Sequence, residues 1–318
     1  MEEQFRKRIN YYGDIKDISL QICKDYNLGE FKSNGIILVG YEDFNFMLQT
    51  SKKKYFIKVF SDFRTLEDCY RYIEIMEKAI EAKIATPKLY KSKQGSLYLK
   101  EINKTKLRLC VMEFIEGKTI YEIGEQLTNK EVRFISKQAV LINSINIKPR
   151  FIYDTWAITN FLAEFEKRSS ALTKEGLKLI VPLVNKFKEL KIEKLPHCFV
   201  HGDILVTNVI KDNKNKLWIV DFSVSNYYPR IQELAVLACN LFFDESSKEK
   251  SEKNLKIALE EYQKTVLLTK EELAALPTYV KLAHTMHLLC ANYEKVANNN
   301  LTKENDYWTS QGRKGLKQ

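Results

Sequence analysis

The hydrophobic positions of the first hundred residues alternate between helical spacing and short strand-like runs. Isoleucines at helical spacing follow Asp14, a residue type that caps helices, and they predict a helix that ends near Asn27. Residues 65–82 repeat the helical spacing over a longer stretch. Five short apolar runs predict strands, and they cover residues 35–40, 44–49, 55–60, 97–99 and 108–112. The first 112 residues therefore indicate a small sheet with one long inserted helix.

The pattern changes after Met112 and becomes mainly helical. Thr128 and Thr269 each stand three residues before a glutamate, a spacing that is typical of a helix start. Helical spacing recurs at residues 129–143, 155–167, 174–190, 232–242, 252–264 and 278–297. One strand-like island interrupts this half at residues 199–222, with a polar turn at residues 212–216. The polar segment from residue 301 to 318 predicts a mobile tail.

Composition narrows the class of protein without identifying it. The chain has 318 residues, of which 45% are hydrophobic and 29% charged, so it is long and apolar enough for a folded protein with one or two cores. The net charge of +10 suits a nucleic-acid binder and equally an enzyme that handles a polyanion. No apolar run approaches the roughly 20 residues of a membrane span, and the polar N-terminus is no signal peptide.

The six cysteines are widely spaced, and most lie in apolar stretches. No two of them form a C-x-x-C pair, so the pattern favours buried thiols over a disulfide framework. Free thiols are typical of a reducing compartment, and we expect the protein to be cytoplasmic. The sequence leaves its oligomeric state open.

The strongest chemical signal lies in the strand-like island. His201, Gly202 and Asp203 stand together, Asn208 follows five positions after Asp203, and Asp221 ends the apolar run after the turn. Phosphoryl transfer needs a carboxylate to orient and deprotonate the acceptor hydroxyl, and oxygen ligands to hold magnesium. Asp203 suits the first role, and Asn208 and Asp221 suit the second. The alternative is a loop in which these residues only form turns.

This segment resembles the catalytic loop and metal-binding aspartate of the aminoglycoside phosphotransferase and choline kinase superfamily. The resemblance implies an α+β, protein-kinase-like bilobal fold and the phosphorylation of a small-molecule hydroxyl by ATP with Mg²⁺. It implies Asp203 as the catalytic base and Asn208 and Asp221 as the magnesium ligands. The catalytic β-hairpin is then expected within a mostly helical C-terminal lobe.

Three further segments resemble the nucleotide-binding parts of that superfamily. Lys58, in an apolar strand, is similar to the lysine that contacts the ATP phosphates. The turn from Gly40 to Asn45 is similar to the turn that covers the phosphates. Glu113 and Ile115 lie in a segment that resembles the hinge, where backbone groups pair with adenine.

These resemblances suggest boundaries for the parts of the chain. We expect a nucleotide-binding lobe at 1–112, a hinge at 113–117 and a catalytic and substrate lobe at 118–300. The tail of residues 301–318 would follow the second lobe.

The sequence departs from the superfamily in three places that matter for catalysis. Leu205 and Val206 are apolar where the family loop carries polar, proline or glycine residues. The glutamate that pairs with the nucleotide lysine is not evident; Glu74 is our choice, with 67 and 77 as the alternatives. Glu233 stands where the family has an aspartate, and either braces the loop or faces solvent.

Other interpretations of the chain stay open. The departures leave a catalytically inactive binding protein on the same fold as the main alternative. We expect no nucleic-acid and no membrane partner, and a nucleic-acid binder is only a third interpretation of the basic charge. His197, Cys198 and His201 lack the partners of a zinc site, so we set a metal site there aside. Residues 226–230 and 153–156 are candidates for acceptor recognition, with packing as the alternative. The acceptor itself, whether an aminoglycoside, amino alcohol, homoserine or sugar, is not identified.

Overall fold

We analysed a computed structural model of the chain, which describes residues 2–38 and 42–318. The chain divides into two compact units that are discontinuous in sequence. Unit 1 comprises Met1–Gly117 and Asp212–Val220, and unit 2 comprises Lys118–Lys211 and Asp221–Gln318. Each unit is described by itself below.

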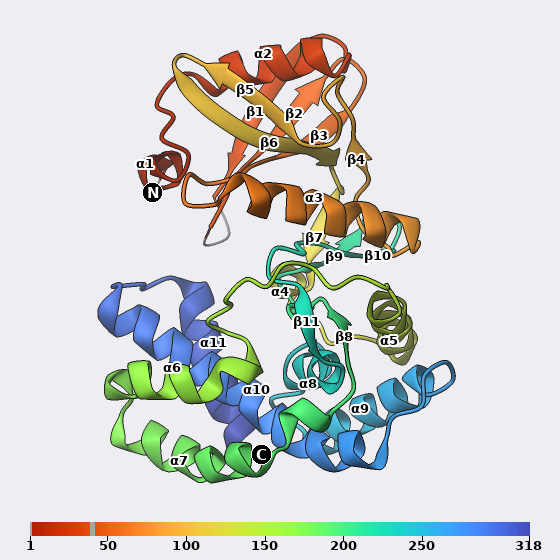
Figure 1. Cartoon of the computed structure of the whole chain (residues 1–318), viewed down its shortest axis with the longest axis vertical. Helices are drawn as coiled ribbons and strands as arrows, with labels where there is room; N and C mark the ends of the chain where they lie inside the picture. Colours follow the sequence, from red (N-terminus) through yellow and green to blue (C-terminus); the bar gives the residue numbers. More distant parts are fainter. Residues whose placement is uncertain (1, 39–41) are drawn as a thin grey trace. The chain divides into compact units, whose positions relative to one another are not determined.

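Unit 1 is built on an antiparallel sheet of order β1-β2-β3-β6-β4, with β5 also paired to β6 (Figure 1). The sequence placed most of these strands, although β1 begins earlier than expected and β4 was not predicted. Their bounds are β1 Phe31–Ile37, β2 Phe44–Thr50, β3 Lys54–Val59, β4 Leu89–Tyr90, β5 Tyr98–Ile102 and β6 Thr105–Glu113.

Three helices accompany this sheet, namely α1 Glu2–Lys7, α2 Ile15–Asp25 and α3 Leu66–Glu81. Asp14 caps α2 by accepting a hydrogen bond from the backbone of Lys16, as the sequence predicted. The isoleucines of α2 join one face of the sheet in a continuous apolar core. Thr65 caps α3 in a reciprocal capping box with Asp68.

Strand alternation sends the side chains of β3 to opposite faces of the sheet. Ile57 and Val59 are fully buried in the core that includes α2. Lys58 lies between them in sequence, and its ammonium lies 5.2 Å from the ring centroid of Tyr72 on α3. The face that carries Lys58 is therefore the one next to α3.

Unit 2 is mainly helical, as the spacing predicted. Its α-helices are α4 Ile120–Ile123, α5 Asn129–Asn143, α6 Phe161–Arg168, α7 Lys174–Glu189, α8 Ile231–Cys239, α9 Lys248–Tyr262, α10 Lys270–Ala297 and α11 Lys303–Lys317. Short 3₁₀ turns occupy Ile158–Asn160, Ser169–Ala171 and Ile192–Lys194. The long helix α10 packs against α8 and α11 (Figure 1).

The strand-like island contains the expected hairpin, and three further short strands lie outside it or overlap its start. The remaining strands are β7 Gly117–Thr119, β8 His197–Val200, β9 Val209–Asp212, β10 Leu217–Ile219 and β11 Asn226–Pro229. One small sheet has the order β10-β9-β7, and β8 pairs with β11 in another. Asn226 lies opposite Val200 in that second pair.

Two expectations about the parts of the chain differ from the structure. The whole of 118–300 was expected in one lobe, but Asp212–Val220 groups with unit 1. Two backbone hydrogen bonds explain this grouping: Ile219 N to Ala85 O at 2.7 Å, and Asn213 N to Glu116 O at 3.2 Å.

The segment expected to be a mobile tail forms α11 instead. Its inner face packs on α10, where Trp308 is buried against the ring of His287. The side chain of Gln311 also lies 2.7 Å from Nδ1 of His287. The polar composition of the segment therefore belongs to one exposed face of an amphipathic helix.

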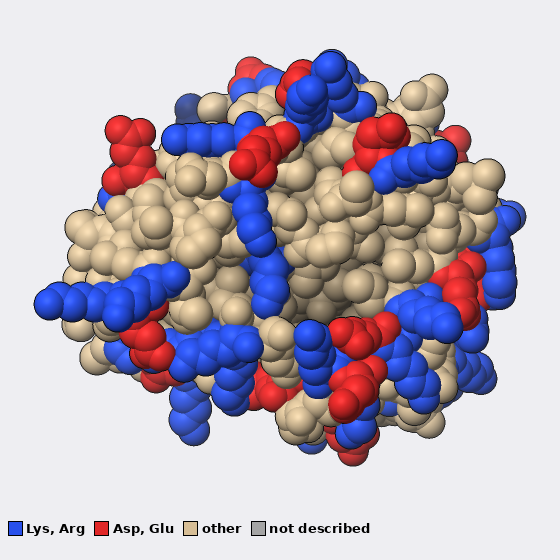
Figure 2. Space-filling model, turned by 90° about the horizontal axis from the view of Figure 1, so that it is seen from below, with Lys and Arg blue, Asp and Glu red and all other residues tan. Residues whose placement is uncertain are grey.

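Basic and acidic side chains are mixed on the face of the molecule that Figure 2 shows. On the face shown in Figure 2, lysines and arginines lie beside aspartates and glutamates, around an area of uncharged residues. Alternation of sign is typical of a solvated surface. Among the described residues, no helix is long and apolar enough to cross a lipid bilayer.

Candidate active site

The segment from His201 to Asn208 folds into a tight loop held by its own hydrogen bonds. Gly202 has a φ of +78°, a backbone conformation that glycine adopts without strain. The backbone N–H of Asp203 donates to Nδ1 of His201 at 3.2 Å. Further along, Leu205 N–H donates to Asp203 O, and Asn208 N–H donates to Leu205 O, each at 2.9 Å.

The loop brings the proposed base and one proposed metal ligand into direct contact. Nδ2 of Asn208 donates to Oδ2 of Asp203 at 2.6 Å and to the Asp203 carbonyl at 3.0 Å. Both side chains are half-buried. This contact fixes the carboxylate of Asp203, and it leaves the carbonyl oxygen of the Asn208 amide as the atom offered to a cation.

Glu233 of α8 braces this loop. The sequence had left two roles open for Glu233, bracing the loop or facing solvent. Its Oε2 accepts a 2.7 Å hydrogen bond from the backbone N–H of His201. The side chain is fully buried, and burial raises the pKa of Glu233 to about 7, although hydrogen bonds from the His201 and Gly202 backbone act in the opposite direction. The carboxylate is therefore an interior hydrogen-bond acceptor and does not face solvent.

Two buried asparagines support the same loop, and the sequence analysis did not identify either of them. Nδ2 of Asn143, at the end of α5, donates to the Phe199 carbonyl at 3.0 Å, and its Oδ1 accepts from the hydroxyl of Tyr262 at 2.7 Å. Asn240, after α8, accepts from the backbone N–H of Val206 at 2.7 Å. In the sequence, each is an asparagine among the apolar positions of a predicted helix. Such asparagines are too common to indicate a role in a functional site.

The apolar residues of the loop have a structural reason. Ile204 and Leu205 are buried, so they anchor the loop in the core of unit 2. The backbone of Val206 is also engaged, because its carbonyl accepts a 2.9 Å hydrogen bond from Tyr121 N–H. The apolar residues thus replace the polar residues usual in the family, and the loop is still held by burial and by a backbone hydrogen bond.

Asp221 follows β10 and has a φ of +66°, an uncommon conformation for a residue other than glycine. Its Oδ1 accepts from Ser223 Oγ at 2.5 Å and from Ser223 N–H at 3.3 Å. The next residue, Phe222, packs its ring against that of His201 with centroids 4.3 Å apart. This contact ties the segment of Asp221 to the loop of Asp203, and the fully buried His201 serves as packing between them.

The donor set suits a hard cation. Asn208 and Asp221 supply an amide oxygen and a carboxylate, the ligand types that magnesium takes when phosphate oxygens and water complete its shell. Within the described residues, no three or more His, Cys, Asp or Glu side chains gather as a metal site of their own.

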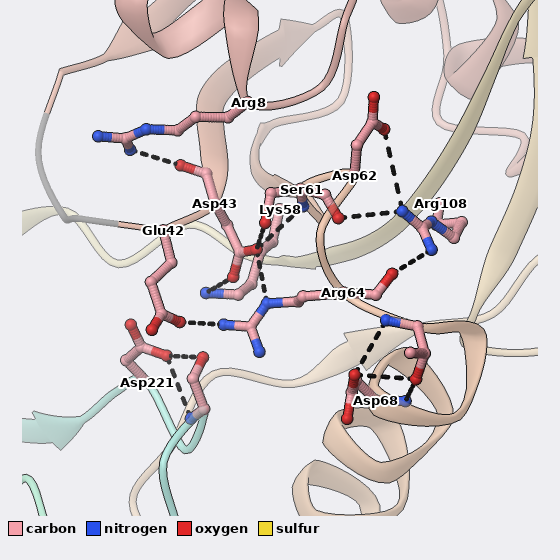
Figure 3. A network of polar contacts seen from close by, with 12 residues as sticks. Arg8, Glu42, Asp43, Lys58, Ser61, Asp62, Arg64, Asp68, Arg108 and Asp221 are labelled. Atoms are coloured by element: carbon pink, nitrogen blue, oxygen red, sulfur yellow. Dashed lines mark hydrogen bonds and ion pairs between the residues drawn. The ribbon is translucent and has the colours of Figure 1, made fainter. Parts of the chain in front are cut away.

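In unit 1, Lys58 is buried and forms an ion pair with Asp43, with 3.0 Å between Nζ and Oδ2 (Figure 3). The expectation that Glu74 of α3 pairs with Lys58 is wrong. Glu74 is exposed on the outer face of the helix, because the inner positions of α3 carry mainly apolar residues, together with Arg71 and Tyr72. The two alternatives, 67 and 77, are exposed as well, and Glu77 binds Ser96 and Lys91 instead.

The other nucleotide-site candidates also lie in unit 1. Asn45 of β2 is half-buried and lies opposite Lys58 in the strand pairing. Glu113 ends β6, and Ile115 follows it in a segment outside the regular elements, where it is half-buried. Gly40 lies outside the described residues.

Two segments proposed for acceptor recognition lie side by side in unit 2. Asn226 of β11 is fully buried and donates from Nδ2 to the carbonyl of Ile152 at 2.9 Å. The exposed Tyr153 follows, and its hydroxyl donates to Glu164 at 2.6 Å. Asp154 accepts from Trp156 N–H at 2.9 Å, so it shapes a turn there.

Comparison with known proteins places the chain among phosphotransferases. A family model described as the phosphotransferase enzyme family matches residues 36–265. Among curated proteins, no sequence matches the chain.

Solved structures match nearly the whole chain at low identity. An amicoumacin kinase in complex with AMP-PNP, Ca²⁺ and Ami has a TM-score of 0.68 and 15% identity, over 99% of this chain and 96% of that one. A spectinomycin phosphotransferase in complex with ADP and spectinomycin has a TM-score of 0.63 and 14% identity, over 95% and 97%. The choline kinase LicA from Streptococcus pneumoniae has a TM-score of 0.63 and 17% identity, over 95% and 98%. These likenesses confirm the protein-kinase-like α+β fold.

Proposed function

The chain belongs to the phosphotransferase enzyme family and is a kinase of small molecules, and from this premise we propose that it transfers the γ-phosphoryl group of ATP to an alcohol through Asp203. The observation that carries the proposal is the hydrogen bond between Asn208 Nδ2 and Asp203 Oδ2 at 2.6 Å. It joins a base to a metal ligand within one loop, and that loop is braced by the buried Glu233.

Asp203 orients the acceptor hydroxyl and accepts its proton as the phosphoryl group is transferred. Its carboxylate is already fixed by Asn208, so little reorganisation is needed when the acceptor binds. This positioning is the main contribution of the chain, because phosphoryl transfer requires little covalent chemistry from the protein.

Asn208 and Asp221 would hold Mg²⁺, which would supply neutralising charge at the phosphate oxygens. The Ser223 hydroxyl and N–H fix the Asp221 carboxylate in place. Lys58 contacts the phosphates that are not transferred. The backbone of Glu113 and Ile115 pairs with adenine, and Gly40 and Asn45 belong to the turn that covers the phosphates.

The acceptor is a small molecule that carries a hydroxyl group. The structurally similar enzymes include a spectinomycin phosphotransferase, an amicoumacin kinase, a choline kinase and an aminopropanol kinase. The adjoining segments at 226–230 and 153–156 are our candidates for acceptor recognition, since Asn226 binds the backbone directly before Tyr153.

The first test is a screen for ADP release with Mg·ATP over hydroxyl-bearing amino alcohols, aminoglycosides, sugars and hydroxy amino acids. With an active acceptor, Asp203→Asn should lower kcat by about 10³-fold or more, because the variant keeps the shape of the side chain and loses the base. Circular dichroism and thermal unfolding check that the fold is retained.

Asp306→Asn is the matched control, since Asp306 is an exposed residue of α11 that pairs with Lys295. It should leave kcat unchanged. A folded Asp203→Asn protein with wild-type kcat would contradict the assigned role. A wild-type chain that binds Mg·ATP but phosphorylates none of the acceptors would favour the inactive binding protein.

A further inference from the structure

Lys58 has a carboxylate partner, but the partner does not come from the helix that was expected to provide it. Asp43 directly precedes β2, and its Oδ2 lies 3.0 Å from the Lys58 ammonium (Figure 3). The side chains of Lys58 and Asp43 are only 5% and 1% exposed. A pair this well buried is only weakly screened by solvent, so its geometry strongly constrains the ammonium.

No glutamate of α3 lies on the face of that helix next to Lys58. Tyr72 presents its ring to the ammonium at 5.2 Å, an attractive but uncharged contact. The hydroxyl of Tyr72 lies near the sulfur of Met112, so the ring is fixed between β6 and the lysine. Asp43 therefore supplies an anion to Lys58, whereas the glutamates of α3 are exposed.

Asp43 is itself held rigidly by groups from two other segments, the turn between β3 and α3 and the chain after α1. Its Oδ1 accepts from Arg64 Nε at 2.8 Å and from Ser61 N–H at 3.1 Å, which leaves Oδ2 for the lysine. Its backbone carbonyl accepts from Arg8 at 2.9 Å. These contacts fix both the main chain and the carboxyl plane of Asp43.

The network also links the residue before Asp43 to the start of α3. Arg64 stands directly before the capping residue of α3 and pairs with Glu42 as well as with Asp43 (Figure 3). Arg108 of β6 donates to the Arg64 carbonyl and to the Ser61 carbonyl, the latter at 3.0 Å. The anion that faces Lys58 is therefore anchored to β6 and α3 at once.

Desolvation alone would raise the pKa of Asp43, but Lys58 and Arg64 outweigh it and lower that pKa to about 2. The carboxylate is thus ionised across the physiological range.

We propose that Asp43 is the residue that positions Lys58 for the phosphates of the nucleotide, in place of a glutamate from α3. The inference deepens the proposed function and rests on it, because Lys58 is taken as the nucleotide lysine. Asp43 acts through Lys58 and touches no reacting atom, so it is a positioning residue. Its effect should therefore be seen only with ligands that carry phosphates.

The experiment compares the dissociation constants of Mg·AMP-PNP and of adenosine, measured by calorimetry on the full chain. Asp43→Asn should weaken AMP-PNP binding at least tenfold and change adenosine binding less than twofold. Glu74→Gln is the control from α3 and should change neither. Equal weakening of both ligands indicates a general structural defect and overturns the proposal, as does unchanged or tighter AMP-PNP binding.

A second pair of variants covers the case in which Asp43→Asn does not fold. Lys58→Met removes the cation, and combining it with Asp43→Asn removes both charges. If Asp43 acts through Lys58, the double variant binds AMP-PNP within twofold of Lys58→Met. A further tenfold loss in the double variant overturns the proposal. A wild-type chain that binds no AMP-PNP overturns the proposed function and this inference with it, whereas the other negative outcomes overturn the inference alone.

Discussion

Each unit contains one buried carboxylate that supports a candidate functional group, and the two carboxylates have opposite acid–base behaviour. Glu233 in unit 2 has a pKa raised to about 7, whereas Asp43 in unit 1 has a pKa lowered to about 2. Both side chains lie in the interior, and both accept hydrogen bonds from backbone N–H groups.

The difference lies in the neighbours of each carboxylate. Asp43 lies between two cations, Lys58 and Arg64. Among the described residues, the donors to Glu233 are neutral and include Asn143 and the His201 backbone. Desolvation by itself favours the neutral acid, and nearby cations reverse that preference. Glu233 thus braces a loop by hydrogen bonding alone, while Asp43 supplies a permanent charge.

The largest expected effect on stability comes from removing the charge of Asp43. Asp43→Asn leaves the buried Lys58 and Arg64 without their shared anion, and we expect the free energy of unfolding to fall by about 3–5 kcal/mol. Urea denaturation followed by circular dichroism measures this loss. Adding Lys58→Met should recover part of it. A loss below about 1 kcal/mol would show that the charges of this network are not what stabilises unit 1.

The pH dependence of stability should separate the two carboxylates by the sign of their effects. Asp43 contributes stability above its unfolded pKa near 3.8, and this contribution is lost as the pH falls through about 2. Glu233 contributes most below its unfolded pKa near 4.5, and its contribution is lost as the pH rises through about 7. Each change amounts to roughly 2–4 kcal/mol, and that of Glu233 is the larger because its pKa shift is larger.

Other groups also titrate over this pH range. The contribution of Glu233 is therefore measured as the difference in stability between the wild type and Glu233→Gln. The urea midpoint of the wild type, relative to that of Glu233→Gln, should decline between pH 4.5 and 7 and then level off. A constant difference across that range would mean that Glu233 is ionised throughout and that its environment resembles that of Asp43.

The smallest expected effect is that of Glu233→Gln itself at pH 5. Glutamine resembles the protonated acid that prevails there, and its carbonyl oxygen can still accept the hydrogen bond from His201 N–H. In the described structure Oε1 of Glu233 has no hydrogen-bond partner, so the variant breaks no contact at that atom. We expect a change in unfolding free energy of about 1 kcal/mol or less. A loss of several kcal/mol at pH 5 would show that the loop needs the negative charge.

Local patterns account for most of the secondary structure that was predicted correctly. The helix at 129–143 has the bounds of α5, because Thr128 and Glu131 form the capping box that their spacing indicates. The tail shows the limit of such patterns. Residues 303–317 are polar overall, and only the packing of Trp308 and Gln311 on α10 reveals which face of that helix is buried.

The sequence by itself determined the contact between Asp203 and Asn208, because five residues of one tight loop suffice to bring their side chains together. It did not determine the partner of Lys58 or the protonation of Glu233. Those depend on strands, turns and helices that meet only when the chain folds, and on whether the groups that meet are charged. Electrostatic interactions vary with distance and burial, and neither quantity can be predicted from the order of residues along the chain.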